Sequence, residues 1–151
     1  MRNIRRFDTF VLALAVLIVS ASLALSGEPM PPGFAAGGIK SGLSRSPDLY
    51  VAGVVEVTGP QQCKDSKDVS TCTADVKLVE VLASRGRKFK RGSVLSMFGA
   101  GGVGERYLAF LVPMPDRSDV FGSTFLAVDA SAEDRNLFAE ELADAGLKPG
   151  D

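Results

Sequence analysis

Histidine is absent from all 151 residues of this chain, and cysteine occurs only twice. Without histidine the chain cannot assemble a Ser-His-Asp or Cys-His catalytic site, a histidine-ligated metal centre or a histidine pH switch. Glu56, Glu80 and Glu105 are scattered, and nothing in the sequence pairs two of them as an acid and a base. We therefore predict no catalytic residue, no metal site and no cofactor, and we expect that the protein is not an enzyme.

The chain also lacks an excess of positive charge. Its 17 Lys and Arg residues are balanced by 18 Asp and Glu residues, which gives a net charge of −1. Surfaces that bind nucleic acid are basic, so this balance argues against DNA or RNA as a partner. No uninterrupted apolar run reaches the length of about 20 residues that a membrane-spanning helix needs.

The first 26 residues have the order of a secretory signal peptide. Arg2, Arg5 and Arg6 precede a short apolar run, and small residues that include Ala24 and Ser26 suit cleavage at the end of the segment. A retained anchor and export by the twin-arginine route are the alternatives. We predict an exported protein, periplasmic or extracellular, with no membrane span after cleavage. Its net charge would be −3, because the removed segment carries three arginines and one aspartate.

Cys63 and Cys72 are expected to form a disulfide in the oxidising compartment that export implies. The residues between them are polar, so the bridge would close a surface loop. A redox-active pair is the alternative, but it usually requires close spacing at a helix start, which lowers a thiol pKa. Asp65, Asp68 and Asp75 near this loop do not have the ligand spacing of an EF-hand. We interpret these three as solvated charges rather than as a calcium site.

The remaining sequence predicts a leader, a β domain and one helix. Residues 27–47 are rich in glycine and proline and have few large apolar groups, so we predict a flexible leader. Residues 131–146 predict an amphipathic helix that packs on the β domain, with Ser131 as N-cap and Gly146 as the stop. A helix that binds a partner is the alternative. Apolar patterns predict five strands, near residues 49–57, 74–82, 93–98, 106–112 and 125–128.

Three of these predicted strands carry more detailed signals. Gly53 marks a bend or bulge in the first strand. In the second strand the apolar positions change parity at Val79 and Val81, which predicts a bulge that bends it. The fourth strand is apolar on both faces and is expected to stop at Pro113.

A glycine-rich segment, residues 99–104, contains the G-x-G-x-x-G spacing of dinucleotide-binding loops. Such a loop must open a helix whose N-terminus holds the pyrophosphate. Here the segment leads into residues 107–113, which have the composition of a strand. We therefore interpret it as a flexible hairpin connection between the third and fourth predicted strands.

A cluster of positive charge lies between the second and third predicted strands, and it is the candidate partner-binding site. An acidic partner, a phosphate group or a polyanion would suit it. Its single aromatic residue makes no stacking platform for single-stranded nucleic acid. The alternative is a solvated turn whose charge offsets the acidic C-terminal helix. The cluster consists of Arg85, Arg87, Lys88, Phe89, Lys90 and Arg91.

The order of these features resembles the netrin-like or tissue-inhibitor-of-metalloproteinase-like module, an OB-type five-stranded barrel found in exported proteins. The resemblance covers about residues 48–130 and implies a closed barrel with binding loops at its rim. Inhibitors of that family use a cysteine at the mature N-terminus, which reaches the zinc of the protease. Here Gly27 lies near the expected mature N-terminus, and the first cysteine is Cys63. The resemblance is carried by residues 48–55, 76–82, 90–94 and 104–111.

The predicted architecture is mainly β: a small OB-like five-stranded barrel at residues 48–130, followed by a C-terminal helix. The function we expect is that of an exported, non-enzymatic binding module that binds an envelope or extracellular protein through the rim loops. A protease inhibitor of the tissue-inhibitor type is one alternative. A hydrolase that uses carboxylate or serine chemistry is the other.

Overall fold

The structure, a computed structural model of the whole chain, describes residues 29–65 and 70–147. The predicted signal peptide at residues 1–26 lies outside the described residues, as do the first two residues of the predicted leader and Asp68. In the described part of the chain, no helix is long and apolar enough to cross a membrane.

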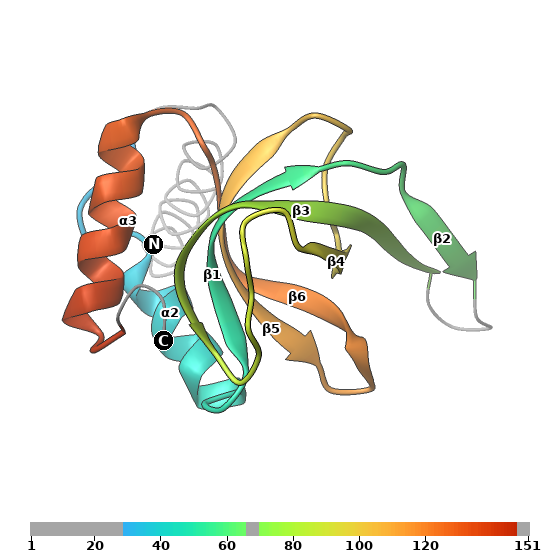
Figure 1. Cartoon of the computed structure of the whole chain (residues 1–151), viewed down its shortest axis with the longest axis horizontal. Helices are drawn as coiled ribbons and strands as arrows, with labels where there is room; N and C mark the ends of the chain where they lie inside the picture. The colour runs from blue at the N-terminus through green and yellow to red at the C-terminus, as the bar shows by residue number, and fades with distance from the viewer. Residues whose placement is uncertain (1–28, 66–69, 148–151) are drawn as a thin grey trace, which may run out of the picture.

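Six strands in the described chain form one sheet that closes into a five-stranded barrel (Figure 1). Strands β1, β5, β6, β4 and β3 pair in that order, and β3 pairs again with β1. The mainly β barrel predicted from the sequence is confirmed, and it is compatible with an OB-like fold. The elements are α2 (Ala36–Arg45), β1 (Tyr50–Val57), β2 (Gln62–Asp65), β3 (Ser70–Arg85), β4 (Val94–Phe98), β5 (Arg106–Met114), β6 (Arg117–Val128) and α3 (Ala132–Asp144).

Strand β3 is bulged where it pairs with β1, and bulges bend the strand that carries them. The register shifts between Ala52 and Gly53 and again between Val54 and Val55, so β3 carries an extra residue at each point. A Cβ atom at Gly53 would collide with the carbonyl oxygen of Glu80, so the close approach of the two strands requires glycine. The bulges predicted from Gly53 and from the change of parity in β3 are confirmed.

The other closing contact is a short parallel pairing of β4 with β6, through Ser96 with Val120 and Met97 with Phe121. Because β6 lies between β5 and β4, those two strands do not pair. The glycine-rich segment at residues 99–104 leads into a strand, β5, as predicted. Its interpretation as a hairpin connection was wrong, because the two strands that it joins, β4 and β5, do not pair with each other.

Disulfide Cys63–Cys72 joins β2 to the start of β3, where the two cysteines are also register partners. This hairpin extends from the end of the molecule that lies away from the helices (Figure 1). The predicted disulfide is confirmed, and it indicates an oxidising, non-cytoplasmic environment. Strand β2 was not predicted, because three of its four residues are polar and it pairs with β3 alone.

Two apolar clusters lie on opposite faces of the sheet. Residues of all five barrel strands form the barrel interior, around Leu78, Met97 and Phe121. The second cluster lies between the outside of the barrel and the two helices, around Phe110 and Phe138. Strand β5 contributes to both clusters, so its prediction as apolar on both faces is confirmed.

Helix α2 corrects the prediction of a flexible leader for residues 36–45. It packs on β5 and β6, beside α3 on the same side of the barrel, and Ile39 is only 1% exposed (Figure 1). Gly38 and Gly42 face the barrel: a Cβ at Gly38 would lie 2.6 Å from the carbonyl oxygen of Thr124, and one at Gly42 would collide with the Phe110 ring. The glycines that suggested a flexible leader therefore allow α2 to pack closely against the barrel.

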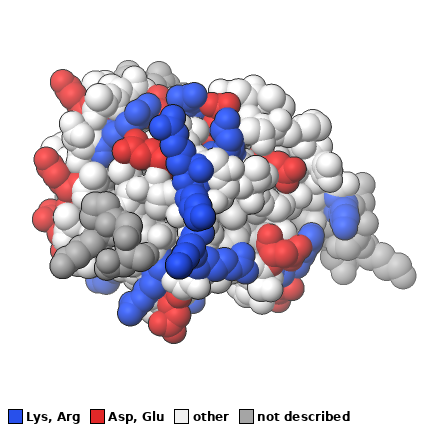
Figure 2. All heavy atoms as spheres, in the orientation of Figure 1, with Lys and Arg blue, Asp and Glu red and all other residues white. Residues whose placement is uncertain are grey.

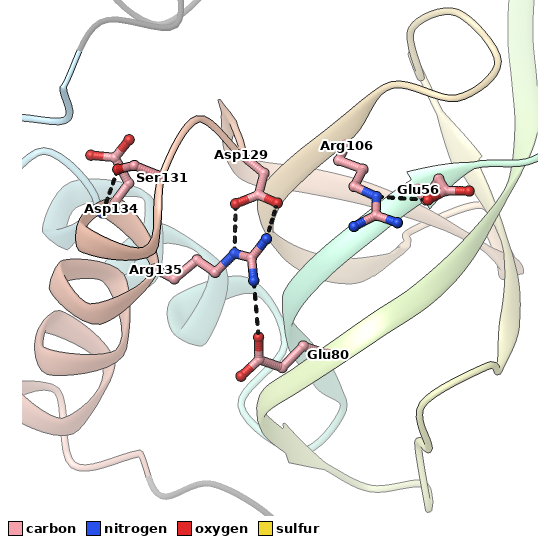
Figure 3. A network of polar contacts seen from close by, with 7 residues as sticks. All are labelled: Glu56, Glu80, Arg106, Asp129, Ser131, Asp134 and Arg135. Atoms are coloured by element: carbon pink, nitrogen blue, oxygen red, sulfur yellow. Dashed lines mark hydrogen bonds and ion pairs between the residues drawn. The ribbon is translucent and has the colours of Figure 1, made fainter.

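Helix α3 is fixed at its first turn by polar contacts (Figure 3). The hydroxyl of Ser131 accepts a hydrogen bond from the backbone N–H of Asp134 at 3.2 Å, which confirms the predicted N-cap. The Arg135 guanidinium donates two hydrogen bonds of 2.7 Å to Asp129 at the end of β6, and it lies 4.0 Å from Glu80 of β3. Asp129 raises the pKa of Arg135 above its ordinary value through these hydrogen bonds.

Several strand boundaries also differ from the prediction, and β3 runs from Ser70 to Arg85 rather than from 74 to 82. Strand β5 continues through Pro113 to Met114, and β6 begins at Arg117 rather than near residue 125. Pro113 is accommodated beside an irregularity in the β5–β6 register, which falls between Pro113 and Met114. The first residues of β6 are polar and exposed, so they carry no apolar pattern that predicts a strand.

The close approach of α2 predicts opposite effects for two adjacent glycines. Gly38→Ala should lower the free energy of unfolding by about 1–3 kcal/mol, because the new methyl group meets rigid backbone. Gly37→Ala, which has nothing within 4 Å, should raise it by about 0.5–1 kcal/mol through better helix propensity. Urea denaturation of the two variants measures both effects. Equal stabilisation by both alanines would contradict the docking of α2.

Candidate functional site

The candidate site is the connection between β3 and β4, which crosses the face of the barrel shown in Figure 2. We call residues 85–91 the basic segment. Five of its seven residues are cationic and all five are exposed. Figure 2 shows Lys and Arg side chains gathered in a continuous band over this connection and the neighbouring strands. The structure therefore brings the cations predicted from the sequence onto one surface.

Backbone hydrogen bonds hold the basic segment against β3. The N–H of Gly92 donates to the carbonyl oxygen of Leu78 at 2.7 Å, and the N–H of Leu78 donates to Ser93 at 2.8 Å. The N–H of Lys90 donates to the Ser93 hydroxyl at 3.1 Å, which fixes the turn before β4. These bonds fix the course of the backbone where the basic segment ends, beside the middle of a barrel strand.

Phe89 has a different role from the cations around it. Its side chain is half-buried and packs against the barrel-interior cluster, edge to face with Phe121 at 6.0 Å between ring centroids. The Arg87 guanidinium lies 6.0 Å from the centre of the same Phe121 ring. Phe89 thus anchors the segment to the barrel, and the accessible part of the candidate site is its five charged side chains.

These cations have no carboxylate partner in the part of the chain that the structure describes. Among residues 29–65 and 70–147, neither Arg85, Arg87 nor Arg91 forms an ion pair, and neither do Lys88 and Lys90. Helix α3 is acidic, but none of its carboxylates contacts the basic segment within that part of the chain. No direct contact in the described chain therefore supports the alternative that the segment offsets the negative charge of α3.

Two more cations join the site from adjacent strands. Lys77 of β3 and Arg106 of β5 line a shallow pocket of about 400 Å³ together with Arg91. Glu56 of β1 pairs in register with both Lys77 and Arg106, and its carboxylate lies 2.7 Å from Nε of Arg106 (Figure 3). These two cations could not be assigned to the site from the sequence. They lie on strands far apart in the chain, and only the pairing of both strands with β1 brings them together near Arg91.

The glycine-rich segment carries the other polar cluster near the barrel rim. Glu105 accepts hydrogen bonds from the N–H of Gly102, at 3.1 Å, and from the hydroxyl of Tyr107. Gln61 donates a hydrogen bond to the carbonyl oxygen of Ala100, which links this segment to the β1–β2 connection. Burial and, after it, the Glu105 carboxylate raise the pKa of Tyr107 from 10.0 to about 12.

The shifted tyrosine predicts a pH dependence in the alkaline range. Because the pKa of Tyr107 is higher in the folded than in the unfolded chain, its contribution to stability is complete below pH 10.0 and is lost as the pH rises toward about 12. Near-ultraviolet titration should show this late phenolate directly, since the chain has two tyrosines and no tryptophan. Tyr107→Phe should remove this late ionisation from the titration curve, and Glu105→Gln should move it to lower pH. A Tyr107 that titrates near pH 10.0 in the folded protein would contradict this geometry.

A scan of the chain against protein-family models finds no match, and a search of the curated proteins finds none either. The function therefore has to follow from the geometry and the charge of the site.

Proposed function

We propose that the protein is an exported, non-enzymatic binding module whose basic segment binds an acidic surface on an envelope or extracellular protein. The observation that carries the proposal is the set of five exposed cations that lie together on the barrel and that, within residues 29–65 and 70–147, have no carboxylate partner. They stand out because the chain as a whole has a net charge of −1.

Unpaired cations at fixed positions favour binding for two reasons. Complementary charge steers an acidic partner toward the site and disfavours partners with positive surfaces. The backbone bonds at Leu78 and Ser93 order the segment in advance, so binding loses less conformational entropy. Three of the five cations are arginines, which bind carboxylates with two parallel hydrogen bonds.

The shape of the site favours a protein partner over a small molecule. The pocket beside Arg91 is shallow, at about 400 Å³, and the cations extend beyond it along the connection. An extended, exposed surface of this kind suits a surface of complementary charge. OB-type barrels bind ligands over the face of their second and third strands, together with the loops that follow the first and fourth strands. In this barrel the second and third strands are β3 and β4, and the basic segment is the loop that joins them, beside that face.

Export and kinship with the netrin-like module belong to the same proposal. The Cys63–Cys72 disulfide and the signal-like order of the first 26 residues support export. The closed barrel with β3 and β4 adjacent supports the kinship at the level of fold, which by itself assigns no function.

Neutralising the basic segment should weaken binding to an acidic polypeptide. We expect the variant R85Q/R87Q/K88Q/K90Q/R91Q to keep its fold, because all five side chains are exposed. Its affinity for polyglutamate, measured by calorimetry at low salt, should fall by at least about tenfold, which corresponds to about 1.4 kcal/mol. The binding of the wild-type protein should also weaken as salt is added.

A matched pair of double variants distinguishes the effect of the position of the charges on binding from the effect of the net charge of the protein. K90Q/R91Q and K64Q/R117Q each remove one lysine and one arginine, but only the first pair lies in the basic segment. The first should weaken binding and reduce crosslinking to acidic proteins in an envelope or secreted extract. The second should change neither. Equal affinities for the two double variants would refute the proposal, and so would a quintuple variant that binds like wild type.

A further inference from the structure

A second candidate site lies between helices α2 and α3, on the side of the barrel that carries the helices. The groove there has a volume of about 690 Å³, which is within the range of small-molecule sites. Leu43 of α2 and Leu137 of α3 provide apolar walls. The charged residues of its lining are Lys40, Glu140, Glu141 and Asp144.

Glu141 is the residue that indicates a ligand. It is 9% exposed, and within residues 29–65 and 70–147 both of its carboxylate oxygens are buried without a hydrogen-bond partner. Asp134, the other buried carboxylate of α3, accepts a hydrogen bond of 2.8 Å from the backbone N–H of Met30. A buried carboxylate without a partner is costly, and a cation or a hydrogen-bond donor in the groove would remove that cost once the Glu141 side chain turns toward it.

The rest of the lining narrows the chemistry of that ligand. Three carboxylates and one lysine give the groove a charge of −2, which favours a dication. Glu140 and Asp144 are exposed and one helical turn apart, so they suit a second positive group at the mouth. Among the described residues no aromatic side chain lines the groove, so they offer no ring face for a quaternary ammonium group. The leucine walls suit a chain of methylene groups.

We propose that the groove between α2 and α3 binds an aliphatic diamine or polyamine. One ammonium group donates hydrogen bonds to the buried carboxylate of Glu141, and the methylene chain lies against Leu43 and Leu137. A second ammonium group lies at the mouth, near Glu140 and Asp144. Lys40 competes with the ligand for the same carboxylates, because it is the cation of the groove lining.

Titration of the full exported chain with putrescine and with spermidine tests the proposal. Calorimetry should show saturable binding of both, with spermidine tighter, and butylamine should bind more weakly because it carries one charge. Glu141→Gln keeps the shape of the side chain and should weaken spermidine binding by about 10- to 100-fold, the range for a hydrogen bond to a charged group. Glu133→Gln removes the same charge from the exposed first turn of α3 and should leave the affinity unchanged.

A variant of Lys40 distinguishes a ligand site from an internal ion pair. Lys40→Met removes the competing cation and should tighten spermidine binding severalfold without lowering the melting temperature. Three results would overturn the proposal. They are the absence of saturable binding to the wild type, an equal loss in Glu133→Gln and Glu141→Gln, and a Lys40→Met protein that melts earlier and binds no tighter. The last result would make Lys40 the partner of Glu141 in the folded chain.

Discussion

The contact between Phe89 and Phe121 is the interaction on which both the barrel and its candidate site depend. The barrel closes at β4 and β6 through only two residue pairs, and Phe121 belongs to one of them. The connection that delivers β4 to this position is the basic segment, and Phe89 packs its ring on Phe121 from within that segment. The packing of Phe89 on Phe121 therefore contributes both to the closure of the barrel and to the position of the basic segment. The same contact keeps the charged side chains on the surface, because the single large apolar residue of the segment is directed into the core.

The two candidate sites share a physical principle, although they have opposite charge. Within the part of the chain that the structure describes, the cations on the barrel face have no carboxylate partner, and the buried Glu141 carboxylate in the groove beside α3 has no donor. A row of exposed cations attracts an acidic partner, and a buried carboxylate, which proteins almost always hydrogen-bond internally, marks a place where a donor from outside can bind. In the described chain no carboxylate of the acidic helix α3 contacts the basic segment. The ion pairs that join α3 to the barrel are those of Arg135 with Asp129 and Glu80.

Local signals in the sequence predicted much of the barrel, and long-range contacts account for what they missed. The bulge at Gly53 and the cap at Ser131 could be predicted, because each depends on residues close in the chain. Helix α2 could not, because Gly38 and Gly42 suggest flexibility until Thr124 and Phe110 are known to lie against them. The cations of the basic segment were visible as a run, whereas Lys77 and Arg106 join them only through pairing with β1. Glu141 belongs to an acidic helix, and nothing in the sequence predicts that its side chain is buried.

The central claim is that position, and not the number of charges alone, makes the basic segment a binding site. The most direct test is the affinity of Phe89→Ala for polyglutamate, with Phe89→Leu as a control that retains an apolar anchor. Both variants keep every charge of the protein, so a difference between them reports the arrangement of the cations. We predict that Phe89→Ala binds at least about fivefold more weakly than wild type while its circular dichroism spectrum still shows a folded barrel, and that Phe89→Leu lies close to wild type. Wild-type affinity in a folded Phe89→Ala protein would contradict the claim.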